Sequence, residues 1–475
     1  MSLSGVVIRE IEPADPARVA LALKNRPGLA FLDSGADDHG LYDRMLGRWS
    51  FVSADPFARF EVRQGRAIWN SSALDEEPLT ALKTKLAAYQ TKTDPAAPPF
   101  QTGAMGFIGY DFGGQLDAVP HMPEADAKTA ALSLGFYDVI FAHDHQDRRS
   151  FILASGWPER DDMRRRARAE ARIAEFLEAI KHIPEPLLPP QTLEGWRSNF
   201  SAKTYETAVT AVIEAILRGD IFQANLSQRF MTTLPEAYDP LAFYMNLRAL
   251  SPAPFGAYLA LGDLTLASNS PERFLSLCHG AIEARPIKGT APRSSNKDED
   301  RAFAAALLAS EKDRAENTMI VDLLRNDLSR VSQPGSVKVP TLCGLETYAN
   351  VHHLVSVVEG RLKSGLDASD VVRAAFPGGS ITGAPKRKAM ELIGQLEGIP
   401  RGAYCGSMGY FGFDGTMDLN IAIRTASFTG NTVQFSVGGG ITALSDPKAE
   451  YQETLVKAER LFKAFGSSLD QPVQS

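Results

Sequence analysis

The chain has 475 residues, of which 44% are hydrophobic and 23% are charged, a composition typical of a globular protein rather than a disordered or fibrous one. Its formal net charge of −7 argues against nucleic acid as the main partner. There is no run of about 18 apolar residues, and the opening MSLSGVVIREIEP has no basic region before an apolar run. Neither a membrane span nor a secretory signal is therefore predicted. Three dispersed cysteines without metal-ligand spacing predict reduced thiols and a cytoplasmic location.

The first half of the chain predicts short strands followed by one long helix. Strand-like runs separated by turns occupy the first 150 residues, for example at 48–52 and around the glycine-rich segment 103–114. Residues 159–182 are highly charged and carry apolar residues at helical spacing. The segment PEPLLPP at 184–190 cannot continue that helix and predicts a stiff linker. We therefore predict an N-terminal region over 1–183, a linker over 184–199, a C-terminal unit over 200–466 and a disordered tail over 467–475.

The C-terminal unit is predicted to be rich in antiparallel strands. Ser201 can cap a helix with apolar residues on one face. Further helices are predicted across 298–330, after Pro385 and from Asp446–Pro447. Strand-like runs lie near 221–231, 255–267 and 272–285, a strand is predicted to end near Val337–Val339, and strand pairs are predicted over 403–413 and 420–437. Because these runs outnumber the helices and are joined by short turns, the predicted fold class is α+β, with antiparallel sheets flanked by helices.

The pentapeptide Pro286–Thr290 (PIKGT) places a lysine where a strand is predicted to end. Residues 280–285 alternate as a strand does and Gly289 permits a sharp turn, so Lys288 is predicted to point at whatever the turn encloses. Partial burial would lower the pKa of this lysine and give a neutral amine able to act as nucleophile or base. On the pentapeptide alone, a surface lysine in a hairpin is the favoured interpretation, and the residues described below shift the balance toward a functional lysine.

Glu316 lies inside the apolar stripe of a predicted helix, together with Met319, Ile320, Leu323 and Leu324. An ionised carboxylate buried without a partner costs several kcal/mol, so Glu316 should be protonated, paired or bound to a cation. Two interpretations stay open from the residues alone. One is a buried ion pair with an arginine, and the other is a metal ligand or catalytic group.

The last predicted helix carries Glu450, Glu453 and Lys457 in one stripe, rotated away from its apolar face. Taken alone, this stripe is interpreted as a solvated face with a Glu453–Lys457 pair. Magnesium, however, takes one or two carboxylates from separate elements plus ligand oxygens. Glu316 facing Glu453 would fit that requirement.

Two glycine-rich turns offer backbone N–H groups to an anion. In 377–393 (PGGSITGAPKRKAMELI), Pro385 near a helix start leaves amide donors free, although the segment is not a P-loop. Gly438–Gly440 follows a predicted strand, and its bare backbone can cradle a carboxylate. Either turn is also compatible with a tight connection. Together with Arg424 they indicate an acidic ligand.

Several long strings resemble the chorismate-utilising enzymes, and within them the large subunits of aminodeoxychorismate synthases. The matching strings are GDIFQANLSQRF, SNSPERFL, RPIKGTAPR, EKDRAENTMIVDLLRNDLSRV, FPGGSITGAPK, GSMGYFGFDG, LNIAIRT and AEYQETLVKAE. The resemblance is strong over 200–465 and weaker over 10–155. It implies two stacked antiparallel sheets between helices, in agreement with the α+β class, and a chorismate-binding catalytic domain over 200–466.

The resemblance also implies roles for individual residues. Glu316 and Glu453 resemble the family's magnesium ligands, with Glu450 close by, and Mg²⁺ would hold the ring carboxylate of chorismate. The implied substrate-binding positions are Thr382, Gly383, Tyr410, Arg424, Gly438, Gly439, Gly440 and Lys457. The implied catalytic positions are Lys288, Glu272 of the PERF motif, Thr290 and His353, the last near the leaving hydroxyl. From the residues alone, His353 is interpreted as a core histidine by default.

Lys288 distinguishes the branches of this family, because sequences resembling anthranilate synthase carry alanine in the same pentapeptide. The resemblance implies that Lys288, deprotonated with help from Glu272, attacks C2 of chorismate and expels the C4 hydroxyl. Ammonia then adds at C4 and releases the lysine. The product is 4-amino-4-deoxychorismate, by a transaminase-class conversion on the way to p-aminobenzoate and folate.

The expected partners follow from what the chain lacks. No cysteine lies in a nucleophile-elbow context such as GxCxG, so the ammonia is expected from a separate glutamine amidotransferase subunit in a heterodimer, or from free ammonium. No lyase domain is expected after 466, so the product should not proceed to p-aminobenzoate. Residues 31–35 and 251–255 fall where relatives form a tryptophan pocket. Tryptophan here is expected to be absent or structural.

Three rival functions stay open at this point. The nearest is an anthranilate synthase large subunit, which differs in regiochemistry and releases pyruvate. The second is a non-catalytic chorismate-binding scaffold subunit that has kept the fold. The third is a Schiff-base lysine enzyme acting on a carbonyl substrate, which accounts for Lys288 but leaves the paired acids unexplained.

Overall fold

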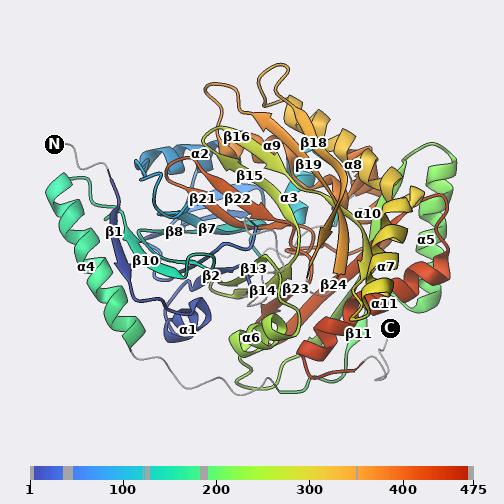
Figure 1. The fold of residues 1–475 in the computed structure, drawn as a ribbon, viewed down its shortest axis with the longest axis horizontal. Coiled ribbons are helices and arrows are strands. Elements are labelled where there is room, and N and C mark those ends of the chain that lie inside the picture. The colour runs from blue at the N-terminus through green and yellow to red at the C-terminus, as the bar shows by residue number, and fades with distance from the viewer. Residues whose placement is uncertain are drawn as a thin grey trace.

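The computed structural model describes residues 5–35, 46–120, 122–123, 129–181, 191–348 and 351–468. Within these ranges the protein consists of two large antiparallel sheets stacked face to face, with helices on the outer face of each (Figure 1). The predicted α+β class with two stacked antiparallel sheets is confirmed. No helix in the described ranges combines the length and apolarity needed to cross a membrane. All three cysteines are free thiols.

The first sheet begins at the N-terminal strands and ends beside the candidate site. Its strands, in spatial order, are β1 (Val7–Ile11), β10 (Arg149–Ala154), β9 (Val139–Asp144), β3 (Trp49–Ser53), β2 (Ala30–Asp33), β13 (Phe255–Ala260), β14 (Leu264–Ser270), β23 (Thr425–Thr429), β24 (Thr432–Ile441), β12 (Gln223–Thr233) and β11 (Arg197–Ser198). The short strand β20 (Gly383–Ala384) pairs with β12 as well. This placement brings a loop from late in the chain against the start of β12.

The second sheet is likewise assembled from both halves of the chain. Its spatial order is β17 (Ile287–Pro292), β19 (Val351–Arg361), β16 (Ala281–Ala284), β15 (Arg273–Cys278), β22 (Met417–Asn420), β21 (Ser407–Gly412), β7 (Gly103–Ile108), β8 (Leu132–Tyr137), β4 (Ala58–Arg63), β5 (Arg66–Trp69) and β6 (Ser72–Ala73). β18 (Lys338–Thr347) pairs with β19. The prediction of a strand that ends near 337–339 is wrong, because a strand begins at Lys338 instead and runs to Thr347 in pairing with β19.

The helices cover the two outer faces. On the first sheet lie α1 (Pro16–Ala22), α4 (Asp162–Lys181), α6 (Pro240–Leu250) and α11 (Pro447–Ala464), and on the second α2 (Pro78–Ala88), α3 (Tyr110–Leu116), α8 (Glu311–Ser329) and α9 (Ala368–Ala375). α5 (Ala202–Leu217) and α10 (Lys386–Glu397) pack around β12, and α7 (Lys297–Ala309) lies on β17. A single 3₁₀ turn, Gly379–Ile381, is described between α9 and β20.

The helix starts follow from local sequence. Ser201 caps α5 in a reciprocal capping box with Thr204, as its position before an amphipathic run predicts. Asp446 caps α11 by accepting a hydrogen bond from the Ala449 N–H, and Pro447 occupies the first turn. α10 begins directly after Pro385. These three predicted starts are confirmed.

Side-chain alternation along the strands fills the space between the sheets. In β21, Met408 and Tyr410 belong to the core between the sheets, whereas Phe411 belongs to the outer core of the second sheet. Phe100 stacks on Tyr410 with ring centroids 4.2 Å apart, and Phe51 of the first sheet meets the same ring edge-on at 5.9 Å. Aromatic contacts of this kind hold the two sheets together.

The N-terminal and C-terminal parts share both sheets. β2 pairs with β13 in the first sheet, and β7 pairs with β21 in the second. Of the predicted linker, 184–190 lies outside the described residues, while Trp196 is buried against the C-terminal part. Ser467, in the predicted tail, is buried and accepts a hydrogen bond from Trp196 Nε1 at 3.1 Å, and 469–475 lie outside the described residues. A division into separately folding units stays a prediction.

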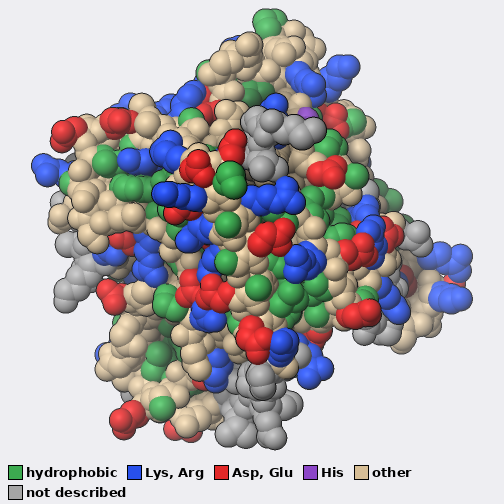
Figure 2. All heavy atoms as spheres, turned by 90° about the vertical axis from the view of Figure 1, so that its left-hand side faces the viewer, with side chains coloured by type: hydrophobic (Ala, Val, Ile, Leu, Met, Phe, Trp, Pro, Cys, Tyr) green, Lys and Arg blue, Asp and Glu red, His purple; other side chains and the backbone are tan. Residues whose placement is uncertain are grey.

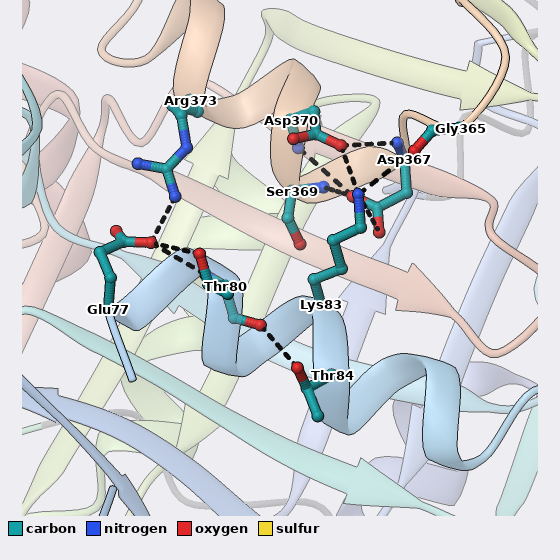
Figure 3. A network of polar contacts seen from close by, with 9 residues as sticks. All are labelled: Glu77, Thr80, Lys83, Thr84, Gly365, Asp367, Ser369, Asp370 and Arg373. Atoms are coloured by element: carbon teal, nitrogen blue, oxygen red, sulfur yellow. Dashed lines mark hydrogen bonds and ion pairs between the residues drawn. The ribbon is translucent and has the colours of Figure 1, made fainter. Parts of the chain in front are cut away.

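Helices α2 and α9 are joined by charged side chains across the two parts of the chain (Figure 3). Lys83 Nζ lies 2.8 Å from Asp370 Oδ2 and 3.7 Å from Asp367 Oδ2, and Arg373 pairs with Glu77. The side chains in these pairs are partly exposed, so each pair stabilises the fold by about 1 kcal/mol or less. α9 leads directly into the glycine-rich turn of the candidate site.

On the face of the molecule shown in Figure 2, basic and acidic side chains are interspersed and neither sign forms a continuous field. α4 illustrates this pattern. Arg168 and Arg172 pair with the buried Asp138, and Glu170 pairs with Arg9. The charged residues of α4 thus form ion pairs with neighbouring elements, as is typical of a solvated helix surface.

Candidate active site

The site forms where the start of β12 lies between two glycine-containing strands. Asn225 pairs with Gly440 of β24 on one side, and Ala224 pairs with Gly383 of β20 on the other. A Cβ atom on Gly383 would lie 2.2 Å from the Gln223 carbonyl oxygen, so only glycine lets β20 approach this closely. The two glycine-rich turns singled out in the sequence therefore flank one strand.

Lys288 and Glu316 approach the backbone at Gly440. A Cβ atom on Gly440 would lie 3.4 Å from Lys288 Nζ, 3.7 Å from Glu316 Oε2 and 3.9 Å from Gln223 Oε1. The lysine comes from β17, the glutamate from α8 and the glutamine from β12. Glycine at this position leaves open the space that these polar atoms border.

The second acidic group approaches the neighbouring Gly439 from α11. A Cβ atom there would lie 3.2 Å from Glu450 Oε2, 3.7 Å from Glu453 Oε1 and 3.7 Å from Lys457 Nζ. Lys457 Nζ contacts Glu453 Oε1 at 2.7 Å, and this pair is half exposed. Lys457 also donates a hydrogen bond to the Gly438 carbonyl at 2.9 Å. The pair expected of a solvated helix face is present, and it borders the glycine turn.

A bulge in β17 contains Lys288, whose amine lies near Gly440. Ile287 pairs with Val355 and Thr290 with His353, so β17 contains one residue more than β19 between these pairs. Gly289 supplies the left-handed conformation with φ of +85°, and a Cβ there would lie 3.0 Å from Leu307 and from Asp313. The turn expected at Gly289 is thus a bulge inside a strand that continues to Pro292.

Burial determines the protonation of Lys288. The side chain is half-buried, and desolvation of its ammonium group lowers the pKa of Lys288. The negative charges of Glu316 and Glu272 raise this pKa but do not offset the desolvation. The charges of Lys457 and Glu453 also act on Lys288. Groups from β17, α8 and α11 therefore form a single electrostatic cluster, and its central amine is easier to deprotonate than an exposed lysine.

Glu272, between β14 and β15, lies behind this lysine. The side chain is buried, and burial raises its pKa to about 7. Glu272 Oε1 accepts hydrogen bonds from Ser380 Oγ at 2.9 Å and from the Ile287 N–H at 3.3 Å. The carboxyl group is thus fixed beside the residue that precedes Lys288, with a pKa suited to taking up and releasing a proton near neutral pH.

His353 is brought to the same region by the pairing of β17 with β19. Its Nδ1 lies 2.9 Å from Thr290 Oγ1. Burial, followed by the charge of Arg424, lowers the pKa of His353 to about 4, so the imidazole is neutral at pH 7. Arg424 has a left-handed backbone with φ of +52°, and its carbonyl accepts the Asn269 N–H.

The structure does not bring Tyr410 to this cluster. Its ring stacks between the sheets and lines a different cavity, because β21 points position 410 toward the core between the sheets. Thr382 is fully buried and donates its hydroxyl hydrogen to the Gly378 carbonyl at 2.9 Å. Thr382 therefore holds the 3₁₀ turn together next to Gly383.

The cavity beside Tyr410 has a volume of about 550 Å³ and includes the segments expected to form a tryptophan pocket. Asp33, Ser34, Pro254 and Phe255 line it. Asp33 is already paired, since its Oδ2 accepts from Arg248 Nε at 2.5 Å and from the Tyr244 hydroxyl at 3.1 Å. The carboxylate of Asp33 is thus already hydrogen-bonded to side chains of the protein itself.

Sequence reasoning missed two polar residues of the site. Gln223 is 2% exposed, and its Oε1 is buried without a hydrogen-bond partner among the described residues while bordering the space at Gly440. Ser380 fixes the Glu272 carboxyl. Both belong to strings that carry the family resemblance, but a single sequence gives no sign that their polar atoms point inward.

The carboxylates near Gly439 and Gly440 offer oxygen atoms of the kind that Mg²⁺ takes as ligands. Burial raises the pKa of Glu316 and Glu450. Burial acts in the same direction on Glu453, but the charge and hydrogen bond of Lys457 leave its pKa lowered. No set of three His, Cys, Asp or Glu side chains forms a ready-made metal cage within the described ranges. The donors fit a magnesium ion held by one or two carboxylates, with ligand and water oxygens completing its shell.

Comparison with known proteins assigns the sequence to one family. The model of the chorismate binding enzyme family matches residues 37–463. Aminodeoxychorismate synthase component 1 of Salmonella typhimurium is 42% identical over 421 residues, covering 87% of this chain and 89% of that protein. The Klebsiella aerogenes protein of the same name is 39% identical over 448 residues, covering 92% and 94%. The crystal structure of anthranilate synthase component I from Streptococcus pneumoniae is 31% identical, with a TM-score of 0.79, covering 87% of this chain and 92% of that one.

The two stacked antiparallel sheets and the family model over most of the chain together define the class as chorismate binding enzymes. The chain belongs to the chorismate binding enzyme family.

Proposed function

We propose that this protein is the large subunit of an aminodeoxychorismate synthase, which converts chorismate and ammonia to 4-amino-4-deoxychorismate. The observation that carries the proposal is the half-buried Lys288 amine, directed by the β17 bulge to within reach of Glu316 and the Gly440 backbone. The names of its curated relatives support the same activity. The test is identification of the product after the purified chain is incubated with chorismate, Mg²⁺ and ammonium.

In the proposed reaction the uncharged Lys288 amine attacks C2 of chorismate. The ring double bonds shift, the C4–O bond breaks, and the hydroxyl leaves as water after taking up a proton. Ammonia then forms a bond to C4, the double bonds shift back, and the C2–N bond to Lys288 breaks. The net reaction converts chorismate and ammonia to aminodeoxychorismate and water, and it regenerates the lysine.

The remaining residues of the cluster bind and orient the substrate in this proposal. The backbone at Gly438–Gly440, Arg424 and Lys457 provide N–H groups and positive charge for the substrate carboxylates. Glu316 and Glu453, with Glu450 close by, would hold Mg²⁺, which neutralises ring-carboxylate charge as the hydroxyl departs. Neutral His353, held by Thr290, is proposed to donate a hydrogen bond to that hydroxyl, which takes up the proton that the Lys288 amine releases on attack.

Glu272 is proposed to accept the Lys288 proton, and this role predicts a pH dependence. Burial raises its pKa to about 7, so the carboxylate that acts as base forms as pH rises through about 7. At a fixed concentration of free ammonia, kcat/KM is expected to rise between about pH 6 and 8, and Glu272→Gln is expected to lose that rise. Because the Ser380 hydrogen bond lowers the pKa of Glu272, Ser380→Ala should move the rise to higher pH. An identical profile in Glu272→Gln would contradict the assignment.

Gln223 provides a second prediction. Its buried oxygen has no partner among the described residues, and we propose that it accepts a hydrogen bond from a bound N–H or O–H group. Gln223→Leu removes an unsatisfied acceptor, so the free energy of unfolding should be unchanged or rise by up to about 1 kcal/mol, while kcat/KM falls about tenfold.

The matched control lies on the same strand. Gln228 is equally buried, but both its amide atoms are bonded, to Thr454 and to Ser198. Gln228→Leu should therefore destabilise the fold by about 1–3 kcal/mol. A Gln223 variant that loses stability in the same way and keeps full activity would reduce Gln223 to a structural residue.

Ammonia is proposed to come from a separate glutamine amidotransferase subunit in a heterodimer. The relatives are named component 1, which supports a partner component. The purified chain should then use ammonium but not glutamine.

A cytoplasmic location is proposed for the protein. For the cavity beside Asp33, tryptophan is proposed to be absent or structural, and calorimetry with tryptophan is the corresponding measurement.

Anthranilate synthase is the second candidate, because a protein of that name has a similar structure. It would release pyruvate and form fluorescent anthranilate from chorismate and ammonium. A lysine amine within the cluster favours the first proposal, since the anthranilate type is expected to carry alanine there. The intact acidic and basic residues of the cluster favour an enzyme over a scaffold subunit.

A further inference from the structure

The first turn of α8 places an exposed lysine next to the acidic cluster. Lys312 lies one helical turn before Glu316, so the two side chains emerge on the same face of the helix with Cβ atoms about 5–6 Å apart. Glu316 borders the open space at Gly440. Lys312 is thus located at the solvent side of the cluster.

Lys312 acts on acids from both helices. Burial raises the pKa of Glu316 and Glu450, and the positive charge of Lys312 opposes that rise. The same charge helps to lower the pKa of Glu453. Lys457, by comparison, is held by contacts with Glu453 and the Gly438 carbonyl. Lys312 is therefore an exposed cation one helical turn from Glu316, and its charge also favours the ionised forms of Glu450 and Glu453.

We propose that Lys312 is a built-in counter-ion of the carboxylate cluster that competes with the divalent cation and weakens its binding. This inference rests on the proposed function, in which Glu316 and Glu453 hold Mg²⁺. A doubly charged ion among the carboxylates repels the Lys312 ammonium, and swinging the side chain outward only partly relieves that repulsion. Lys312 thus sets the metal affinity without being a ligand.

The measurement is the dissociation constant of Mg²⁺ for the purified full-length chain, by isothermal titration calorimetry at low ionic strength. Lys312→Gln, which keeps length and polarity but removes the charge, should bind Mg²⁺ about three- to tenfold more tightly than the unmodified chain. The gain should shrink toward onefold at about 1 M monovalent salt, because the interaction is screened. Lys312→Arg should leave the affinity unchanged.

Two further variants separate this inference from the proposed function. Lys388→Gln removes an exposed charge on α10 that pairs with Glu391, and it should leave the Mg²⁺ affinity unchanged. Glu316→Gln should weaken Mg²⁺ binding. If it does so while Lys312→Gln binds Mg²⁺ no more tightly, the role of Lys312 is overturned and the metal site stands. If Glu316→Gln has no effect, the metal binds elsewhere and both ideas are overturned.

Discussion

Lys288→Ala is expected to reduce aminodeoxychorismate formation by about 10³-fold or more, because the nucleophile of the proposed covalent step is gone. The fold should be nearly unaffected. The lysine side chain is half-buried, and its bulge is formed by Gly289 and the pairing with β19. A change in the free energy of unfolding below about 1 kcal/mol is therefore expected. The measurements are product formation by chromatography and denaturant unfolding of the same preparations.

Lys288→Arg is the matched control for charge. An arginine keeps a positive charge among the acids but is not deprotonated in proteins, so it cannot supply a neutral amine. The arginine variant should be as inactive as the alanine variant. Near-normal turnover by either variant would remove the covalent step from the account.

Glu316→Gln and Glu453→Gln are expected to cause the second-largest losses. Each keeps the side-chain shape but removes a negative charge and a strong oxygen donor. We expect Mg²⁺ to bind each at least about tenfold more weakly and kcat/KM to fall about 10²-fold or more at limiting metal. Part of that loss should be recovered at high Mg²⁺ concentration.

Exposed acids on the same helices provide the controls for these variants. Asp322 on α8 pairs with Arg325, and Glu459 on α11 pairs with Lys463, both at the surface. Asp322→Asn and Glu459→Gln should leave Mg²⁺ binding and activity unchanged. Equal losses in cluster and control variants would mean that general surface charge, not the cluster, governs the metal dependence.

The sequence predicted those features that depend on short-range chemistry. Ser201 and Asp446 mark helix starts because a side-chain oxygen next to an amphipathic run caps free N–H groups wherever the helix packs. The α+β class followed from runs of strand residues joined by short turns. The cluster of Lys288, Glu316 and Glu453 followed from the family resemblance, since spacing within one helix does not reveal what a side chain faces.

The remaining features depend on long-range pairing. The bulge at Lys288 exists because β17 and β19 pair out of step by one residue, and neither strand alone contains that register. The position of Tyr410 is set by which face of β21 meets the other sheet, and a shift of one residue would reverse it. Gln223 borders the site because β12 lies between β20 and β24, strands that are far away in sequence.

The most direct test of the Lys288 mechanism is mass spectrometry of the protein, quenched after mixing with chorismate and Mg²⁺ in the absence of ammonia. The mechanism predicts an adduct with the mass of chorismate less one water, located on the peptide that contains Lys288 and removed when ammonium is added before the quench. Full turnover with ammonium but no adduct at any quench time, or an adduct on a different residue, would contradict it.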